Sequence, residues 1–386
     1  MVFKPGTVGA ALFAGLYALP AQAADIIVSA QDGKFVRVEG RATFPQPAPR
    51  DSLVVIDASV SPPVIKGTLE GLEHTVQGPP QAVAVTPDGK LAIVAAPTRY
   101  DYDAKKELFD NFLQIVDIEA SPPVLLGKVD VGGHPNGLTI NRDGTLLLAA
   151  AHDGTVKVLT IAGKDVKLID QVKVGEKRLS GISFTHDGKA AIVALRDENG
   201  AAVLAVDGTT VTLTKERLST GVNPYAIDVS SDGKWAVIGN TGVGGRIVDD
   251  DDVVTLVDVS KRPFRSIQQI SVPSTPEGVA ISPDGRWIVV SSMAGTNLLA
   301  TDPGRNKRGK VTLFSNKNGV ATKVNDVPGG EAAQGVVFSK DSKQILLQMD
   351  VERALAVYTI RNGKLADTGT RIPLAAGPVS IRSMPR

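Results

Sequence analysis

A short phrase, two apolar segments around a tight turn, occurs six times along this chain. Its clearest copy is GVAISPDGRWIVVSS, residues 278–292. The turn aspartates of the six copies are Asp88, Asp143, Asp187, Asp232, Asp284 and Asp341. Successive aspartates are 55, 44, 45, 52 and 57 residues apart. A period of roughly 50 residues, with about four strands in each unit, is typical of the blades of a β-propeller.

Each copy has the pattern of a β-hairpin. Glycine after the aspartate readily takes the positive φ that a tight turn needs. Apolar residues alternate before the turn, as in Val279 and Ile281, and this period of two predicts a strand. A third apolar segment follows, such as residues 113–118 or 254–259, and a more polar fourth segment closes the unit. Because one such sheet cannot bury both of its faces, the units must stack in a ring.

The two ends of the chain supply one further unit. Residues 377–383 resemble a first strand with no second strand after it. Residues 26–30, 53–57 and 64–69 resemble the missing second, third and fourth strands. Dividing the 363 residues that follow residue 23 by seven gives about 52 per blade, which agrees with the repeat. We therefore predict an all-β fold, one seven-bladed β-propeller with four antiparallel strands per blade, closed by a blade built from both termini.

The first 23 residues have the features of a secretory signal peptide. Lys4 supplies positive charge, residues 8–19 form an apolar run, and Ala21-Gln22-Ala23 fits the small-residue cleavage pattern. The run is shorter than the roughly 20 residues of a membrane span, although an uncleaved anchor is the alternative. We expect a signal peptide at 1–23, a single propeller domain at 24–386, and a periplasmic or secreted protein without a transmembrane segment after cleavage near Ala23.

Composition argues against several classes of function. The chain has no cysteine, so it has no disulfide, thiolate metal site or c-type haem attachment. Its 42 basic and 41 acidic residues give a net charge of +1, which creates no overall field for DNA or an anionic membrane. The nucleophile elbow, the HExxH motif and the phosphate-binding loop of nucleotide hydrolases are all missing from the sequence. The sequence therefore predicts no cofactor and no bound metal.

The repeated unit and third-strand endings such as Ile115-Val116-Asp117 resemble the YVTN-repeat, lactonase-like family of seven-bladed β-propellers. The resemblance covers nearly all of the expected mature chain and implies the propeller fold. The second strand departs from the sequence motif of the family, since only Ile238-Gly239-Asn240 keeps the asparagine. Fold persists through such drift more readily than function does.

Only one end of the predicted ring carries long connections. The turns between first and second strands are short and repetitive, and we call that end the turn face. The connections between second and third strands are irregular, at residues 34–50, 97–111, 241–252 and 294–309. Long loops on a rigid scaffold usually carry binding sites. We therefore expect the functional site on this second end, which we call the loop face.

The residue that enters each first strand is expected at the rim of the central channel on the loop face. From blade 1 to blade 7 these residues are Pro378, Gln81, Asn136, Ser180, Tyr225, Glu277 and Gln334. Arg178 and Arg196 are expected beside Ser180, and His134 beside Asn136. A polar funnel with carboxylate, imidazole and guanidinium groups suits a small anionic molecule. A water-filled rim with structural hydrogen bonds is the alternative.

Three other features permit more than one interpretation. The acidic run of residues 249–252 suits either a cation or a solvated surface paired with the basic residues of the next insertion. Residues 100–112 suit one or two helical turns, as a lid or as an inert surface segment. Asp228 lies within a first strand, where a hydrogen-bonded structural carboxylate is expected.

Two hypotheses for function follow. The first is a binding protein of the cell envelope, expected to be monomeric, whose loop face takes a small anionic ligand or an envelope protein partner. The second, implied by the family resemblance, is a lactonase-type hydrolase or lactonizing enzyme. In that interpretation Glu277 is the general base, Arg178 and Arg196 orient the anion, and His134 assists proton transfer.

Binding of single-stranded nucleic acid is disfavoured. Such binding uses aromatic platforms in a basic groove. The chain has only 4% aromatic residues and a net charge near zero, and Tyr225 is the one aromatic residue expected at the rim.

Overall fold

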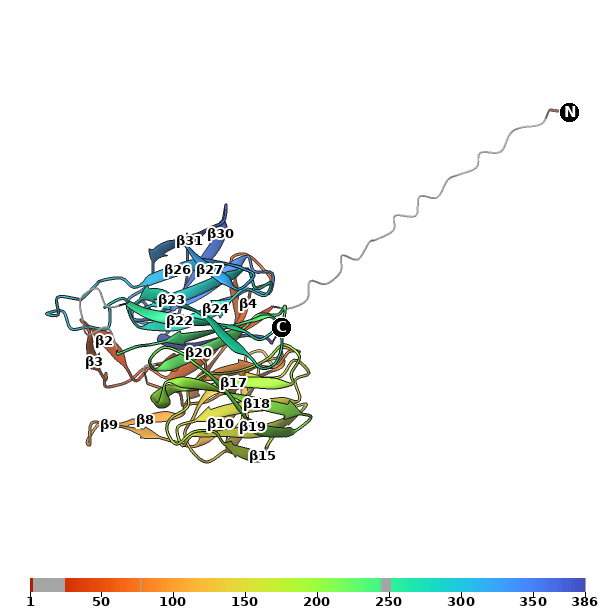
Figure 1. Ribbon diagram of the computed structural model, residues 1–386. Coiled ribbons are helices and arrows are strands. Elements are labelled where there is room, and N and C mark those ends of the chain that lie inside the picture. The colour runs from red at the N-terminus through yellow and green to blue at the C-terminus, as the bar shows by residue number, and fades with distance from the viewer. Residues whose placement is uncertain (3–24, 77, 244–250, 386) are drawn as a thin grey trace.

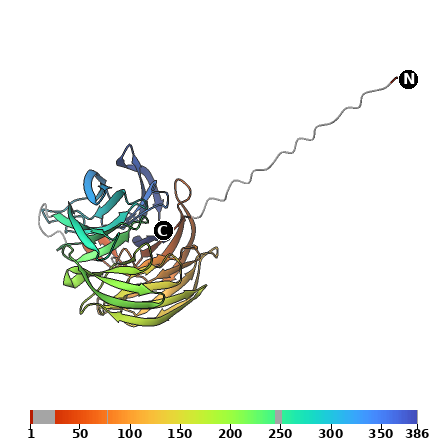
Figure 2. The ribbon, with the colours of Figure 1, turned by 45° about the vertical axis from the view of Figure 1, so that its right-hand side comes forward.

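The protein is a seven-bladed β-propeller in the computed structural model, which describes residues 1–2, 25–76, 78–243 and 251–385. The blades follow one another around the ring in chain order (Figures 1 and 2). The described residues contain no α-helix, and one short 3-10 segment spans Arg196–Glu198. Residues 3–23 of the expected signal peptide lie outside the described residues. Within them, no helix is long and apolar enough to cross a membrane.

Each blade is a four-stranded antiparallel sheet whose strands succeed one another from the channel outward. Blade 1 contains β32 (Gly377–Ser383), β1 (Ile26–Asp32), β4 (Asp51–Asp57) and β5 (Val64–Leu72). Blade 2 contains β6 (Val83–Val85), β7 (Leu91–Val94), β10 (Phe112–Asp117) and β11 (Val124–Asp130). Blade 3 contains β12 (Pro135–Ile140), β13 (Leu146–Ala151), β14 (Thr155–Ala162) and β15 (Asp165–Lys173).

The remaining four blades repeat this order. Blade 4 contains β16 (Ile182–Phe184), β17 (Ala190–Leu195), β18 (Gly200–Asp207) and β19 (Thr210–Leu218). Blade 5 contains β20 (Pro224–Val229), β21 (Trp235–Asn240), β22 (Asp251–Asp258) and β23 (Arg265–Pro273). Blade 6 contains β24 (Pro276–Ile281), β25 (Trp287–Ser292), β26 (Lys310–Lys317) and β27 (Val320–Pro328). Blade 7 contains β28 (Ala333–Phe338), β29 (Gln344–Met349), β30 (Ala354–Arg361) and β31 (Lys364–Pro373).

The recurring aspartate has a structural role in the turn between the first two strands. In blade 2 the hydroxyl of Thr86 donates to Asp88 Oδ1 at 2.6 Å and accepts the N–H of Leu91 at 3.0 Å. Gly89 follows with φ of 70°, a conformation that glycine takes without strain. Serine or threonine takes the place of Thr86 in blades 4 to 7, and Asn141 does so in blade 3. The repeat therefore encodes a hairpin and not a set of catalytic acids.

The apolar core lies between the blades. Leu91 and Ile93 of blade 2 pack in one cluster with Leu138 and Leu147 of blade 3. The first and last blades meet in the same way, because Ile27 and Ile56 of blade 1 pack with Leu346 and Leu355 of blade 7. Stacking of neighbouring sheets thus buries the faces that no single blade could cover.

Blade 1 closes the ring as predicted. Strand β32 pairs with β1, which places Ala30 opposite Ser380. The fully buried Gln348 of blade 7 secures this seam, since its Nε2 donates to Ser29 Oγ and to the Ser380 carbonyl, both at 2.8 Å. Its Oε1 accepts the N–H of Gly335 at 3.1 Å. One amide therefore links the first strands of blade 7 to both ends of the chain.

Two insertions form β-hairpins on the loop face, where they project from the same side of the ring (Figure 1). In blade 1, β2 (Val36–Val38) pairs with β3 (Arg41–Thr43). In blade 2, β8 (Thr98–Asp101) pairs with β9 (Lys106–Phe109), so the expected helical turns at 100–112 are wrong. Asp101 Oδ1 accepts the N–H groups of Asp103 and Ala104, which closes a turn instead of starting a helix.

We predict that Gln348→Ala lowers the free energy of unfolding by about 3 kcal/mol. The substitution leaves the buried Gly335 N–H and Ser380 carbonyl without this partner, and each lost partner costs about 1–3 kcal/mol. Urea unfolding measures the change, with the exposed Lys364→Ala as a control. A change below about 0.5 kcal/mol in Gln348→Ala would show that the seam does not depend on this amide.

Candidate functional site

The connection between β5 and β6 lies over the central channel on the loop face. Its residues Thr75, Val76 and Pro80 are buried. A Cβ at Gly78 would lie 3.1 Å from both Gln334 Oε1 and Tyr225 Oη, so the connection touches blades 5 and 7. The connection also contacts blade 1, because the ring of its buried residue His74 lies 3.0 Å from Oγ of Ser380 in β32. The centre of the loop face is therefore covered and is not an open funnel.

Two of the predicted rim residues serve as braces between blades. Gln81 crosses the channel, since its Nε2 donates to the Ile227 carbonyl at 2.6 Å and its Oε1 accepts the Ile227 N–H at 3.0 Å. Ser180 Oγ donates to the carbonyl of Pro224 at 2.8 Å. These contacts join blades 2, 4 and 5, and they account for the polar character of both positions.

An open pocket lies to one side of the channel, and we call it the off-axis pocket. Its volume is about 330 Å³. Glu277 and Arg196 line it together with Arg37, which belongs to hairpin β2–β3. Arg37 Nη1 donates to the carbonyls of Gly40 and Asn297, at 3.1 and 3.3 Å. The other lining residues are Asn223, Thr241, Gly242, Val243, Thr275, Met293 and Asn297.

Glu277 is the acidic group of this pocket. Its Oε2 is buried and has no hydrogen-bond partner among the described residues. Burial raises the pKa of the Glu277 carboxyl to about 7, although the charges of Arg196 and Arg37 act in the opposite direction. The group therefore changes charge near neutral pH, as general acids and bases do.

Arg196 lines the same pocket as Glu277 and lies near enough for its charge to act on that carboxyl. Its guanidinium carbon lies 4.0 Å from the centre of the Tyr225 ring, within the range of a cation–π contact. Its Nε and Nη1 are buried and have no hydrogen-bond partner among the described residues. Burial and the nearby Glu277 raise the pKa of Tyr225, so its hydroxyl stays protonated. Arg196 thus offers two buried N–H donors that have no acceptor among the described residues.

The histidines of the loop face form a separate cluster. The rings of His134 and His152 lie 4.6 Å apart, and Phe109 of hairpin β8–β9 covers His134 at 4.8 Å. His134 Nδ1 lies 2.9 Å from the Asp110 carbonyl, and Asn136 Nδ2 donates to His152 Nε2 at 2.7 Å. Burial lowers the pKa of both imidazoles, that of His152 to about 3. These rings are neutral at physiological pH, and His134 is not among the residues lining the off-axis pocket.

The remaining predicted ligands occupy different surroundings. Arg178 forms an ion pair with Asp197, with 3.1 Å between Nη2 and Oδ1, and is partly exposed. Gln334 is buried, and its Oε1 is unpartnered among the described residues, as is Oδ1 of Asn136. The structure thus brings together Glu277, Arg196 and Tyr225, and it places His134 and Arg178 nearer His152.

Among the charged groups of this face that went unpredicted are Asp350 and Arg37. Asp350 follows β29 as Arg196 follows β17, so the position after each second strand would have identified it. Burial and the charge of Asp32 raise the pKa of Asp350 to about 8, while Arg37 lowers it. No comparable signal existed for Arg37, because it lies in an insertion that the other blades do not share.

Described residues of the two charged insertions have hydrogen-bond partners elsewhere on the loop face. Arg305 bonds to Glu331 and to the Thr296 carbonyl. Asp252 Oδ2 accepts the N–H of Thr275 at 2.6 Å, whereas residues 249 and 250 lie outside the described residues. In the part of the chain that the structure describes, no group of three or more acids or histidines is placed to hold a metal.

Comparison with known proteins supports the fold. Residues 128–159 match the model of the WD domain, G-beta repeat. No curated protein matches the sequence. The chain is similar in structure to a candidate 6-phosphogluconolactonase from Bacteroides fragilis, with a TM-score of 0.68, 16% identity, and 95% of this chain and 99% of that one covered.

Two further solved structures show the same architecture. The periplasmic gluconolactonase of Pseudomonas aeruginosa gives a TM-score of 0.63 at 15% identity, with 93% of this chain and 99% of that one covered. A chain of Kuenenia stuttgartiensis hydrazine synthase gives 0.61 at 20% identity, with coverage of 81% and 92%. The class is therefore the seven-bladed β-propellers, among them lactonase-like proteins. At these identities the likeness shows the fold alone.

Proposed function

We propose that this protein binds a small anionic molecule in the off-axis pocket. The observation that carries the proposal is Arg196, whose buried Nε and Nη1 have no acceptor among the described residues. A buried guanidinium donor without a partner costs free energy, which a bound carboxylate or phosphate recovers through charge-assisted hydrogen bonds. A volume of about 330 Å³ is at the lower end of the range for small-molecule sites.

The neighbours of Arg196 favour the same ligand. Arg37 adds a second guanidinium to the lining of the pocket. Glu277 is mostly neutral below pH 7, so that its carboxyl group can donate a hydrogen bond to an anion. An envelope protein that inserts a carboxylate side chain would use the same groups, but the size of the pocket favours a free small molecule.

We expect gluconate, used as a probe, to bind in isothermal titration calorimetry, with an affinity that falls about tenfold as pH rises from about 6 to about 8.5. The reason is that Glu277 ionises near pH 7 and then repels the anion. Glu277→Gln should remove this pH dependence and bind more tightly than the wild type at the upper end of that range. Arg196→Gln should weaken binding about 10- to 100-fold.

Arg371→Gln is the matched control, because Arg371 pairs with Asp367 on the outer strand β31. Equal losses in Arg196→Gln and Arg371→Gln would contradict a specific site. A pH dependence that persists in Glu277→Gln would assign it to another group, and Asp350 is the first to examine.

Hydrolysis of a lactone is the second candidate function, favoured by a carboxyl with a pKa of about 7 beside two guanidinium groups. Ionised Glu277 would take a proton from a water molecule while the oxygen of that water bonds to the carbonyl carbon of the lactone. Arg196 would stabilise the oxyanion. As the ring C–O bond breaks, the proton passes from Glu277 to the departing alkoxide, and the product is a hydroxy acid.

For gluconolactone and carboxylated lactones, blank-corrected kcat/KM should then rise with pH to a plateau above about pH 7. Glu277→Gln should lower the plateau about 10²- to 10⁴-fold, since that is the usual contribution of a general base. Glu119→Gln, an exposed surface change, is the control. No turnover by the folded wild-type protein would remove this function for the lactones tested and leave the binding proposal standing.

We further propose that the mature protein is exported. Support comes from Lys4, the apolar run at 8–19 and the Ala21-Gln22-Ala23 pattern. Mass spectrometry of the chain from the periplasm or medium of the native cell should find Ala24 as the first residue. An intact chain beginning at Met1 in the cytoplasm would contradict export.

A further inference from the structure

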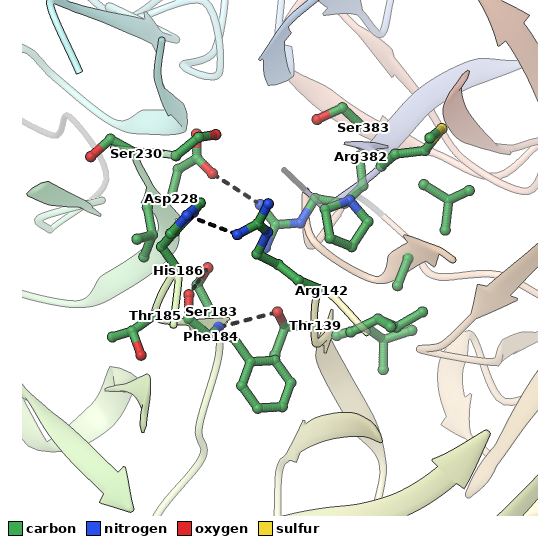
Figure 3. A pocket seen from close by; sticks show the side chains of 18 of the residues that line it. Thr139, Arg142, Ser183, Phe184, Thr185, His186, Asp228, Ser230, Arg382 and Ser383 are labelled. Atoms are coloured by element: carbon green, nitrogen blue, oxygen red, sulfur yellow. Dashed lines mark hydrogen bonds and ion pairs between the residues drawn. The ribbon is translucent and has the colours of Figure 1, made fainter. Parts of the chain in front are cut away.

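The turn face has a pocket of its own, distinct from the off-axis pocket. It has a volume of about 100 Å³ and lies where the first strands of blades 3, 4 and 5 end (Figure 3). Arg142, His186, Asp228 and Arg382 line it, together with the hydroxyl residues Thr139 and Ser183. The Gln81 brace between blades 2 and 5 lies between this pocket and the loop face.

Arg382 reaches into this pocket from the last strand of the chain. It extends from blade 1 toward blades 4 and 5, and only 15% of its side chain is exposed. Its Nη2 lies 3.4 Å from the Ile182 carbonyl, and its Nη1 lies 3.5 Å from the Ile227 carbonyl. These are long for hydrogen bonds from a guanidinium, which holds a carboxylate or phosphate oxygen at about 2.7–2.9 Å. The N–H donors of Arg382 therefore make only weak hydrogen bonds to the backbone carbonyls around them.

Asp228 neutralises Arg382 only in part. The two groups lie 3.7 Å apart, from Nη1 to Oδ1. The carboxylate also accepts the N–H of Ile281 at 2.9 Å, as expected of a structural acid. Burial lowers the pKa of Arg382, which indicates that desolvation outweighs the attraction of Asp228.

Arg142 and His186 form the outer side of the pocket. Arg142 Nη1 lies 2.8 Å from His186 Nε2. A guanidinium only donates, so Nε2 accepts this bond and Nδ1 carries the ring proton. That Nδ1 is shielded from solvent and has no partner among the described residues. The mouth therefore presents a second guanidinium, that of Arg142.

The hydroxyl groups add to this set of donors. Thr139 Oγ1 accepts the N–H of Phe184 at 3.3 Å, which leaves its O–H to donate. By contrast, Ser230 and Thr185 already donate to the turn aspartates Asp232 and Asp187. With two guanidinium groups and one carboxylate, the pocket carries an excess of positive charge.

We propose that this turn-face pocket binds a tetrahedral oxyanion: inorganic phosphate or sulfate, or the terminal phosphate of an ester. An oxyanion there takes short hydrogen bonds from Arg382 and Thr139, which the protein's own acceptors do not supply, and a further one from the donors of Arg142 that are not bonded to His186. The size of the pocket limits the ligand to a small group, because a cavity of about 150 Å³ holds benzene and this pocket is smaller. A larger ester is accommodated only with its organic part outside the mouth.

The test is calorimetric titration of the mature chain with inorganic phosphate at low ionic strength. Arg142→Gln and Arg382→Gln should each weaken binding at least tenfold. Arg286→Gln is the control, because Arg286 is an exposed arginine in a turn of the same face and lies outside the pocket. Arg142 is exposed at the surface, so its variant tests the site even where Arg382→Gln fails to fold.

Absence of phosphate binding by the wild type would overturn the proposal, as would equal weakening by all three arginine variants. Similar affinities for phosphate and sulfate would support a free oxyanion, and tighter binding of glycerol phosphate would support an ester. Loss of phosphate binding in Arg142→Gln but not in Arg196→Gln would assign the phosphate to the turn face, whereas the reverse would assign it to the off-axis pocket and overturn the proposal.

Discussion

Antiparallel pairing of β32 with β1 is the contact on which the rest of the structure depends. A propeller blade buries its faces only against its neighbours, so an open ring would expose the apolar sides of blades 1 and 7. Pairing of the chain ends removes both exposed sides at once. The buried amide of Gln348 then ties blade 7 to each of the two closing strands.

The ring was predictable because its determinants are local and repeated. A hydroxyl or amide residue, an aspartate and usually a glycine define each turn, and period-two apolar residues define each adjoining strand. The candidate site was only partly predictable. Glu277 and Arg196 occupy repeated positions, whereas Arg37 reaches the pocket on a hairpin inserted in blade 1. No repeat could place that hairpin, because its position depends on contacts with residues 297–300 of blade 6.

The same reasoning explains why the expected funnel is absent. Position in a repeat identifies which residues surround the channel, but it does not show what fills the channel. The connection containing Gly78 covers the central entrance, and Gln81 spans the interior. The open space on the loop face is therefore displaced toward blades 5 and 6, beneath hairpin β2–β3.

Glu277 distinguishes binding from catalysis at the off-axis pocket because its two protonation states favour opposite outcomes. In the proposed binding site the neutral acid would accommodate an anion beside Arg196 and Arg37, whereas in the proposed lactonase the carboxylate would accept a proton from water. Burial places the change between these states near pH 7, so neither form dominates in a neutral compartment. A hydroxy acid formed by the carboxylate would itself be an anion, and the ionised Glu277 that produced it would then favour its release.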